Sequence, residues 1–167
     1  MITRKTRLNQ IIELSGECRK CGKCCSLGSG YLIDADIPRI AKFLGINEEE
    51  LKEKYLEKVN MYGKDNLRPK TKDKGKGYGE CIFLENNLCK IHEAKPLNCR
   101  IGTCRPIGKE ISVWFALNHF IDADNPQSIR DWKIYLDCGG KNIPGGKLEE
   151  LVPDKEKLKR ILEYDVL

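Results

Sequence analysis

The chain of 167 residues lacks several features that would place it in a familiar class of protein. No apolar run is long enough to span a membrane, and the N-terminal stretch has no apolar segment of signal-peptide length. We therefore expect a cytoplasmic protein with no membrane partner. Only two histidines are present, so no serine–histidine–acid arrangement can be assigned, and enzymatic activity stays undetermined. A formal charge of +5 permits an acidic partner without indicating one.

Cysteine is the most informative residue type in this sequence. There are nine cysteines, and an odd number cannot pair completely into disulfides. Thiols also stay reduced in the cytosol. A chain of this length can bury an ordinary hydrophobic core, so it does not need disulfides to fold. These considerations favour metal ligation over a disulfide framework.

Hydrophobic periodicity and capping residues predict a single α+β domain over residues 1–167. We expect a small, loop-rich fold, with short helices and a β-hairpin packed around a cysteine-ligated metal centre. Residue Asp36 is the expected cap of one of the helices. The predicted helices cover 6–14, 36–45, 47–60, 125–138 and 154–164. The predicted hairpin covers 80–91 and turns at Glu85-Asn86-Asn87.

The remaining segments are expected to be loops or a buried element. Glycines and adjacent cysteines indicate a tight loop over 17–30, and prolines and glycines indicate another over 95–108. The stretch 110–121 is a predicted strand or buried segment. The stretch 63–79 is rich in lysine and glycine and is expected to be a mobile surface loop. Its lysines allow contact with nucleic acid or an acidic protein, but no aromatic residues alternate with them.

The first four cysteines form the pattern C-x-x-C-x-x-C-C. Gaps of two residues let successive thiolates turn toward one centre, as in zinc sites and iron–sulfur proteins. The first two gaps match the start of the bacterial ferredoxin pattern, and the third does not. We expect the adjacent side chains of Cys24 and Cys25 to diverge and not to bind one ion together. One of the two would then serve a second metal, a bridge or packing.

The other five cysteines lie in loops or at the ends of predicted elements, where the backbone can wrap around a ligand. All nine cysteines are candidate metal ligands, and all except Cys104 are assigned to a cluster. The candidates are Cys18, Cys21, Cys24, Cys25, Cys81, Cys89, Cys99, Cys104 and Cys138. Basic residues interleaved with them would offset thiolate charge, and Arg100 is the strongest candidate because it follows Cys99 directly. The interleaved residues are Arg19, Lys20, Lys23, Lys90, Arg100 and Arg105.

Four pieces of the sequence, in this order, resemble the CxxCxxCC cysteine-cluster family. They are CRKCGKCC at 18–25, DIPRIAKFLGINEEELKEKYL at 36–56, GECIFLENNLCKIHEAKPLNCR at 79–100 and DCGG at 137–140. Members of this family are usually described as zinc- or iron-chelating domains. The grouping takes in the cysteine region of flagellin lysine N-methylases.

The resemblance implies that the four clustered cysteines meet Cys81, Cys89, Cys99 and Cys138 around metal. It also implies that Lys95-Pro96-Leu97 and Arg100 shape the loop that delivers Cys99. The chain departs from the family in two places. His92 and Lys95 stand where relatives commonly have tyrosine and arginine. Ile101-Gly102-Thr103-Cys104 replaces the aromatic residue and proline that tend to follow the cysteine–arginine pair.

Three functions are compatible with these residues. The preferred hypothesis is an iron–sulfur protein with a [4Fe–4S] cluster, room for a second centre, and a redox or modification-related role. Its support is that nine thiols exceed the four that one tetrahedral zinc uses. The alternatives are a structural zinc module that binds a partner protein, and an enzyme that modifies protein or tRNA, such as a lysine methyltransferase-like protein. A methyltransferase would need a site for a nucleotide-type cofactor, and the sequence has no glycine-rich fingerprint for one, because Gly28-Ser29-Gly30 is too short. An unidentified protein or redox partner is expected.

Overall fold

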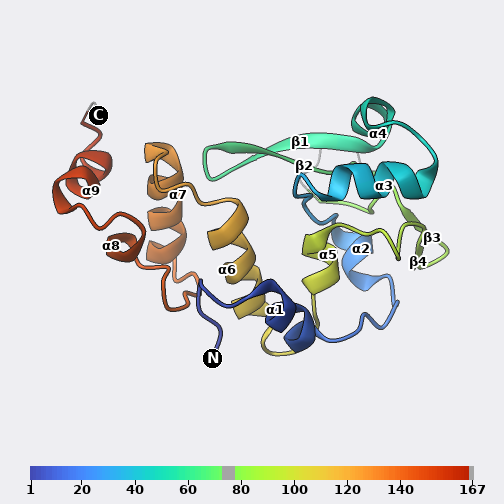
Figure 1. Ribbon diagram of the computed structural model, residues 1–167, viewed down its shortest axis with the longest axis horizontal. Helices are drawn as coiled ribbons and strands as arrows, with labels where there is room; N and C mark the ends of the chain where they lie inside the picture. Colours follow the sequence, from blue (N-terminus) through green and yellow to red (C-terminus); the bar gives the residue numbers. More distant parts are fainter. Residues whose placement is uncertain (73–77, 166–167) are drawn as a thin grey trace. The chain divides into compact units, whose positions relative to one another are not determined.

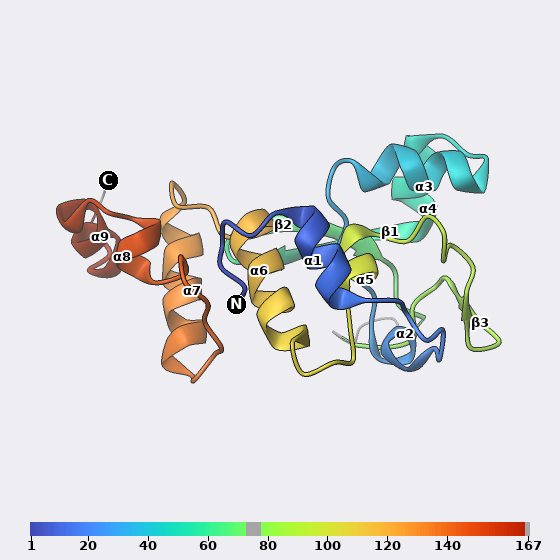
Figure 2. The same cartoon turned by 60° about the horizontal axis from the view of Figure 1, so that its bottom comes forward.

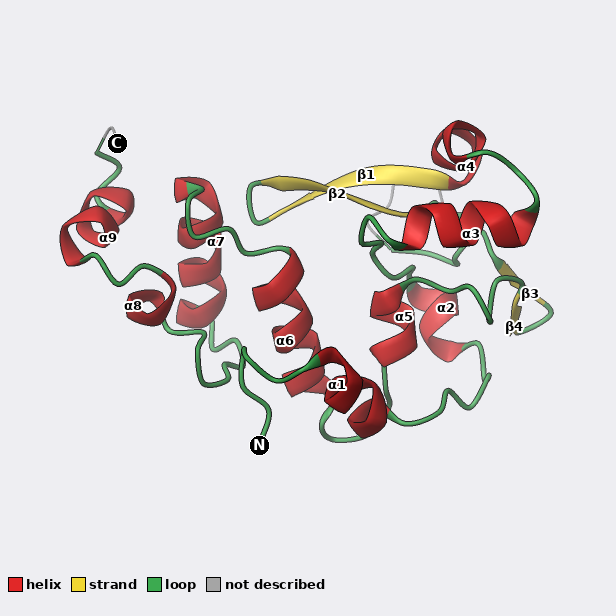
Figure 3. Cartoon of the chain, viewed as in Figure 1, coloured by secondary structure: helices red, strands yellow, loops and turns green. Residues whose placement is uncertain are grey.

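The computed structural model describes residues 1–72 and 78–165, and this part of the chain is α+β (Figures 1 and 3). It divides into two compact units. Unit 1 comprises Met1–Ser15, Asn60–Asp65 and Thr103–Leu167. Unit 2 comprises Gly16–Val59 and Asn66–Gly102. In the described residues, no helix has both the length and the apolar character needed to cross a membrane.

Unit 2 contains most of the short elements that carry cysteines. Its helices are α2 (Lys23–Leu27), α3 (Asp36–Leu44), α4 (Glu48–Tyr55) and α5 (Leu97–Ile101). Strands β3 (Leu84–Glu85) and β4 (Leu88–Cys89) form an antiparallel hairpin, in which Leu84 pairs with Cys89. Strands β1 (Leu56–Met61) and β2 (Lys64–Pro69) form a second two-stranded sheet, whose tip belongs to unit 1.

The core of unit 2 joins α3 and α4 to the 81–94 region. Helix α3 ends at Gly45, whose left-handed φ of 69° lets its N–H return to the carbonyls of the last turn. Helix α4 then begins at Asn47, whose side chain accepts a hydrogen bond from Glu50 N. Buried members of this core include Leu51, Phe83 and Cys81. This packing fixes the start of the hairpin segment at Cys81 inside the core.

Unit 1 is helical apart from the tip of the β1–β2 sheet. Its helices are α1 (Leu8–Ser15), α6 (Gly108–His119), α7 (Pro126–Asp137), α8 (Leu148–Leu151) and α9 (Lys155–Leu162). Figure 2 shows α7 next to α8 and α9, and α1 next to α6. Trp132 on α7 is fully buried and donates its indole N–H to Gly146 O at 2.8 Å. Asn125 caps α7 through Gln127 N at 2.9 Å.

Most predicted elements are confirmed, and several predictions need correction. The predicted helix over 47–60 ends at Tyr55, because the chain becomes extended at Leu56 and pairs with β2. That pairing also makes Lys64–Pro69 a strand and not part of a loop. Residues 73–77 of the predicted mobile loop lie outside the described residues. The stretch 110–121, predicted as a strand or a buried segment, is buried but helical. It lies mainly in α6, whose apolar side chains are buried on several faces and so obscure the helical period.

Two short helices lie in stretches predicted as loops. Helix α2 occupies part of 17–30, and α5 occupies part of 95–108. Each has five residues, which is too short to give a hydrophobic pattern. Both helices carry cysteines that are candidate metal ligands, so the local structure of the candidate site differs from the predicted loops.

Candidate metal centre

The nine cysteines are unevenly distributed between the two units, and all are free thiols. Unit 2 contains seven of them, at positions 18, 21, 24, 25, 81, 89 and 99. Cys104 and Cys138 belong to unit 1. Unit 2 alone therefore has more thiols than the four that one tetrahedral ion binds.

Helix α2 brings two thiols of the cysteine motif together. The Sγ atoms of Cys24 and Cys25 are 3.8 Å apart, so the prediction that these side chains diverge is wrong. Consecutive side chains leave a helix about 100° apart, whereas in a strand they point to opposite faces. Two thiolates bound to one tetrahedral ion at about 2.3 Å would lie about 3.8 Å from each other. The spacing of this pair therefore fits two ligands of a single ion.

The α2 segment lies against the segment that carries Cys81 and Cys89. Cys81 N donates to Cys25 O at 2.8 Å, and Gly79 N donates to Leu27 O at 3.3 Å. At the start of α2, a Cβ added to Gly22 would lie 2.9 Å from the Asn87 carbonyl oxygen at the turn of the β3–β4 hairpin. The motif is thus held against the hairpin by backbone contacts at both ends of α2.

Helix α5 brings Cys99 to the residues that follow α2. The backbone N–H of Gly30 partly offsets the rise in the pKa of Cys99 that burial causes. A Cβ at Gly30 would overlap the Cys99 sulfur. Beside it, Tyr31 N donates to Asn98 Oδ1 at 3.2 Å. Cys99 therefore packs directly on a glycine of the segment that begins at the motif.

Burial keeps several of these thiols in their protonated form. Desolvation raises the pKa of Cys81 to about 11 and that of Cys99 to about 12, and it also raises the pKa of Cys89. The Cys24–Cys25 pair behaves differently. A hydrogen bond from Cys25 stabilises the Cys24 thiolate and lowers the pKa of Cys24 to about 6, and the same bond raises the pKa of Cys25. This pair loses its first proton more readily than an ordinary thiol.

The thiols of unit 2 also influence one another electrostatically. The charge of Cys24 raises the pKa of Cys81, Cys89 and Cys99. Cys18 also raises the pKa of Cys89. Six thiols from three segments of unit 2 act on one another in this way. They are Cys18, Cys24, Cys25, Cys81, Cys89 and Cys99.

Two lysines supply positive charge to this group of thiols. Lys95 lowers the pKa of Cys24 and of Cys89, and Lys72 lowers the pKa of Cys81. Neither is among the six interleaved basic residues that were expected to offset thiolate charge, although the family resemblance places Lys95 in the loop that delivers Cys99. Lys72 is nine residues from Cys81 in the sequence. The bridge between Thr71 and Cys81 and the hydrogen bond from Lys72 N to Glu80 O, 2.7 Å long, bring it close. Lys90, which was singled out, pairs with Glu85 at 2.9 Å.

The structure shows the thiols gathered but not closed around an ion. Among residues 1–72 and 78–165, no group of three or more cysteine, histidine or carboxylate side chains could hold a metal ion as it stands. The motif itself is exposed, and none of residues 17–27 is buried. The donor chemistry and the Cys24–Cys25 spacing fit a thiolate-bound metal.

Residues 17–118 match the sequence model of the CxxCxxCC family, which is described as a putative zinc- or iron-chelating domain. The chain belongs to this family. The resemblance drawn from the motifs is therefore confirmed, and zinc or iron chelation is the function that the family description gives. The matched range of the CxxCxxCC domain contains eight of the nine cysteines and ends before Cys138. No curated protein and no solved structure matches the chain.

Proposed function

We propose that unit 2 holds an iron–sulfur centre through thiolates of its three cysteine-bearing segments. The observation that carries this proposal is the convergence of thiols from the motif, the 81–89 hairpin segment and α5. None of residues 17–27, which contain the motif, is buried, so the hydrophobic effect contributes little to the order of this segment. A bound metal would supply that order, because the free energy of metal binding is available to fix the loops that carry the ligands.

The number of thiols favours a polynuclear centre. A single zinc ion binds four thiolates, and unit 2 has seven cysteines. A [4Fe–4S] cluster also takes four protein thiolates, and the remaining thiols then allow a second centre or an exchangeable ligand. In such a cluster each iron takes one cysteine, so Cys24 and Cys25 would bind different irons, or only one of them would bind.

Zinc is the second candidate, and one distance favours it. The 3.8 Å between the sulfurs of Cys24 and Cys25 is the separation of two thiolates on one tetrahedral ion. In this case the site would be structural, because zinc has no redox chemistry, and the domain would act by presenting a binding surface to a partner protein. Cys104 and Cys138 stay candidate ligands from the sequence.

An iron–sulfur centre would give this chain a redox role. Lysines 72 and 95 lie where they lower the pKa of nearby thiols. Positive charge near a cluster, and its degree of solvent exposure, set its reduction potential. Cys18, Cys21 and Cys24 are exposed, so this side of the centre would be accessible to an electron-transfer partner.

Metal analysis of the protein purified without oxygen tests the proposal. We expect iron together with acid-labile sulfide, and visible absorption that bleaches on reduction. Colourless protein that contains zinc alone would decide for the second candidate, and protein free of both metals would contradict both. At least one of the variants Cys24→Ser and Cys25→Ser should lose metal. Ser26→Ala is the matched control, because it changes the next exposed residue of α2 and removes no thiol.

A further inference from the structure

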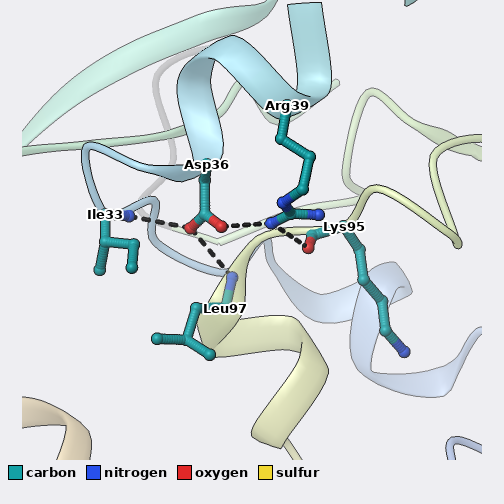
Figure 4. Close-up of polar contacts among 5 residues, drawn as sticks. All are labelled: Ile33, Asp36, Arg39, Lys95 and Leu97. Atoms are coloured by element: carbon teal, nitrogen blue, oxygen red, sulfur yellow. Dashed lines mark hydrogen bonds and ion pairs between the residues drawn. The ribbon is translucent and has the colours of Figure 1, made fainter. Parts of the chain in front are cut away.

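A buried carboxylate in unit 2 links the helix after the cysteine motif to the helix that carries Cys99. Asp36 is the first residue of α3 and is only 2% exposed. Its Oδ2 accepts hydrogen bonds from Ile33 N and from Leu97 N, both at 2.9 Å. Figure 4 shows both bonds converging on the same oxygen. Asp36 was expected to cap α3, but it lies inside that helix and joins two segments that are 61 residues apart.

Leu97 N needs an acceptor from elsewhere in the chain. It is the first amide of α5, and the first amides of a helix have no partner within the helix. The residue before it is Pro96, which has no side-chain acceptor and makes no capping bond. The Asp36 carboxylate therefore takes the place of the missing cap, two residues before Cys99.

Arg39 completes this arrangement. Its Nη2 pairs with Asp36 Oδ1 and also donates to the carbonyl of Lys95 at 3.1 Å. The guanidinium thus fixes the backbone on the other side of Pro96. In Figure 4 the Lys95 side chain extends away from Asp36. This is the lysine whose charge lowers the pKa of Cys24 and Cys89.

We propose that Asp36, supported by Arg39, is a positioning residue that holds Lys95–Cys99 against Gly30–Ile33 and so sets the Cys99 thiolate for metal. Two other contacts join the same segments: the Cys99 sulfur packs closely on Gly30, and Tyr31 N donates to Asn98 Oδ1 at 3.2 Å. The Asp36 carboxylate adds a third link, because it accepts hydrogen bonds from both Ile33 N and Leu97 N. The proposal rests on the proposed metal-binding function, but the position of Cys99 can be measured without metal.

The first test measures alkylation of single cysteines in the metal-free protein by mass spectrometry. Loss of hydrogen bonds to a charged group should raise local opening about 10- to 100-fold. In Asp36→Asn the amide cannot accept from all three donors, so Cys99 should react at least about tenfold faster. Cys81 lies in the core of unit 2 and should keep its rate, because only general unfolding exposes it. Faster labelling of both cysteines, or of neither, would overturn the proposal.

The second test uses Co²⁺ as the probe, since its thiolate charge-transfer absorption reports how many sulfurs bind. Asp36→Asn should weaken Co²⁺ binding about 10- to 100-fold. In a Cys99→Ser background the same change should have little further effect, because its influence passes through Cys99. Additive losses in the double variant would contradict the inference. Wild-type protein that binds no Co²⁺ would instead count against metal binding, and the labelling result would still decide the role of Asp36.

Two further variants keep the test decisive. Arg39→Gln alters the side chain that is 34% exposed and leaves the buried carboxylate in place, so it should fold and give a smaller change in the same direction. Glu57→Gln is the matched control. It breaks the Arg68–Glu57 pair, 2.8 Å long, on two strands that carry no cysteine. If Glu57→Gln accelerated Cys99 labelling as much as Asp36→Asn does, the effect would not be specific to Asp36 and the proposal would fail.

Discussion

Replacing Gly30 with alanine tests whether the Cys99 sulfur has one required position. Gly30 does not have a left-handed φ, so its backbone accepts alanine. The new Cβ, however, would overlap the Cys99 sulfur and lie 3.2 Å from both Asn98 Oδ1 and Cys99 N. Carbon normally contacts other heavy atoms at about 3.5–4.0 Å, so the sulfur would have to move by more than about 1 Å.

The glycine segment cannot easily retreat to make this room. On its other side Ser29 Oγ donates to Pro69 O at 2.5 Å, and Leu32 N donates to Leu67 O at 2.8 Å. Overpacking of this kind typically lowers the free energy of unfolding by about 1–3 kcal/mol. Distances from a metal to its ligands vary by only about 0.2 Å. A shift of more than about 1 Å should therefore remove Cys99 from the coordination shell.

The assay compares Gly30→Ala with Gly28→Ala. Gly28 has an extended φ of 175°, and a Cβ there would meet no atom within 4 Å. We expect Gly30→Ala to unfold at lower urea concentration and to bind less metal, while Gly28→Ala matches the wild type in both measurements. Equal metal content and equal stability for the two variants would refute the packing argument at Cys99.

Three other predictions concern metal removal, pH and helix capping. Trypsin should cut the basic, exposed stretch 17–27 faster after the metal is removed by a chelator, and equal rates would show that metal does not order it. The pKa values of Cys81 and Cys99 are raised above the ordinary 9.0 to about 11 and about 12. Their contribution to the free energy of unfolding of the metal-free protein is therefore complete below pH 9 and is lost between about pH 9 and 12. Urea titrations across this range should show that the free energy of unfolding falls more steeply with pH in the wild type than in Cys81→Ser. Asn47→Ala removes the cap bond to Glu50 N, 2.8 Å long, and should cost about 1 kcal/mol without changing metal content; a parallel loss of metal would contradict this.

The helices with clear caps and periodicity could be predicted from the sequence. Three predicted helices begin at Asn47, Asn125 and Asp154, and each of these residues caps the helix that follows. The 84–89 hairpin was also predictable, because Asn86 and Asn87 readily adopt the positive φ angles of 49° and 63° that its turn uses.

The arrangement of the thiols could be predicted only in part. The motif spacing indicated a shared centre, but the short helix α2 that brings Cys24 and Cys25 together carries no periodic signal of its own. The contacts of Asp36 with Leu97 and of Lys72 with the carbonyl of Leu84 depend on tertiary packing. No local pattern encodes such contacts, so the residues that support the cysteines came from the structure.

X-ray absorption at the metal edge of the protein purified without oxygen is the most direct test that thiolates from separate segments share one centre. The account predicts a first shell of sulfur at about 2.3 Å, with an additional iron–iron contribution if the centre is an iron–sulfur cluster. A first shell of oxygen or nitrogen would contradict it.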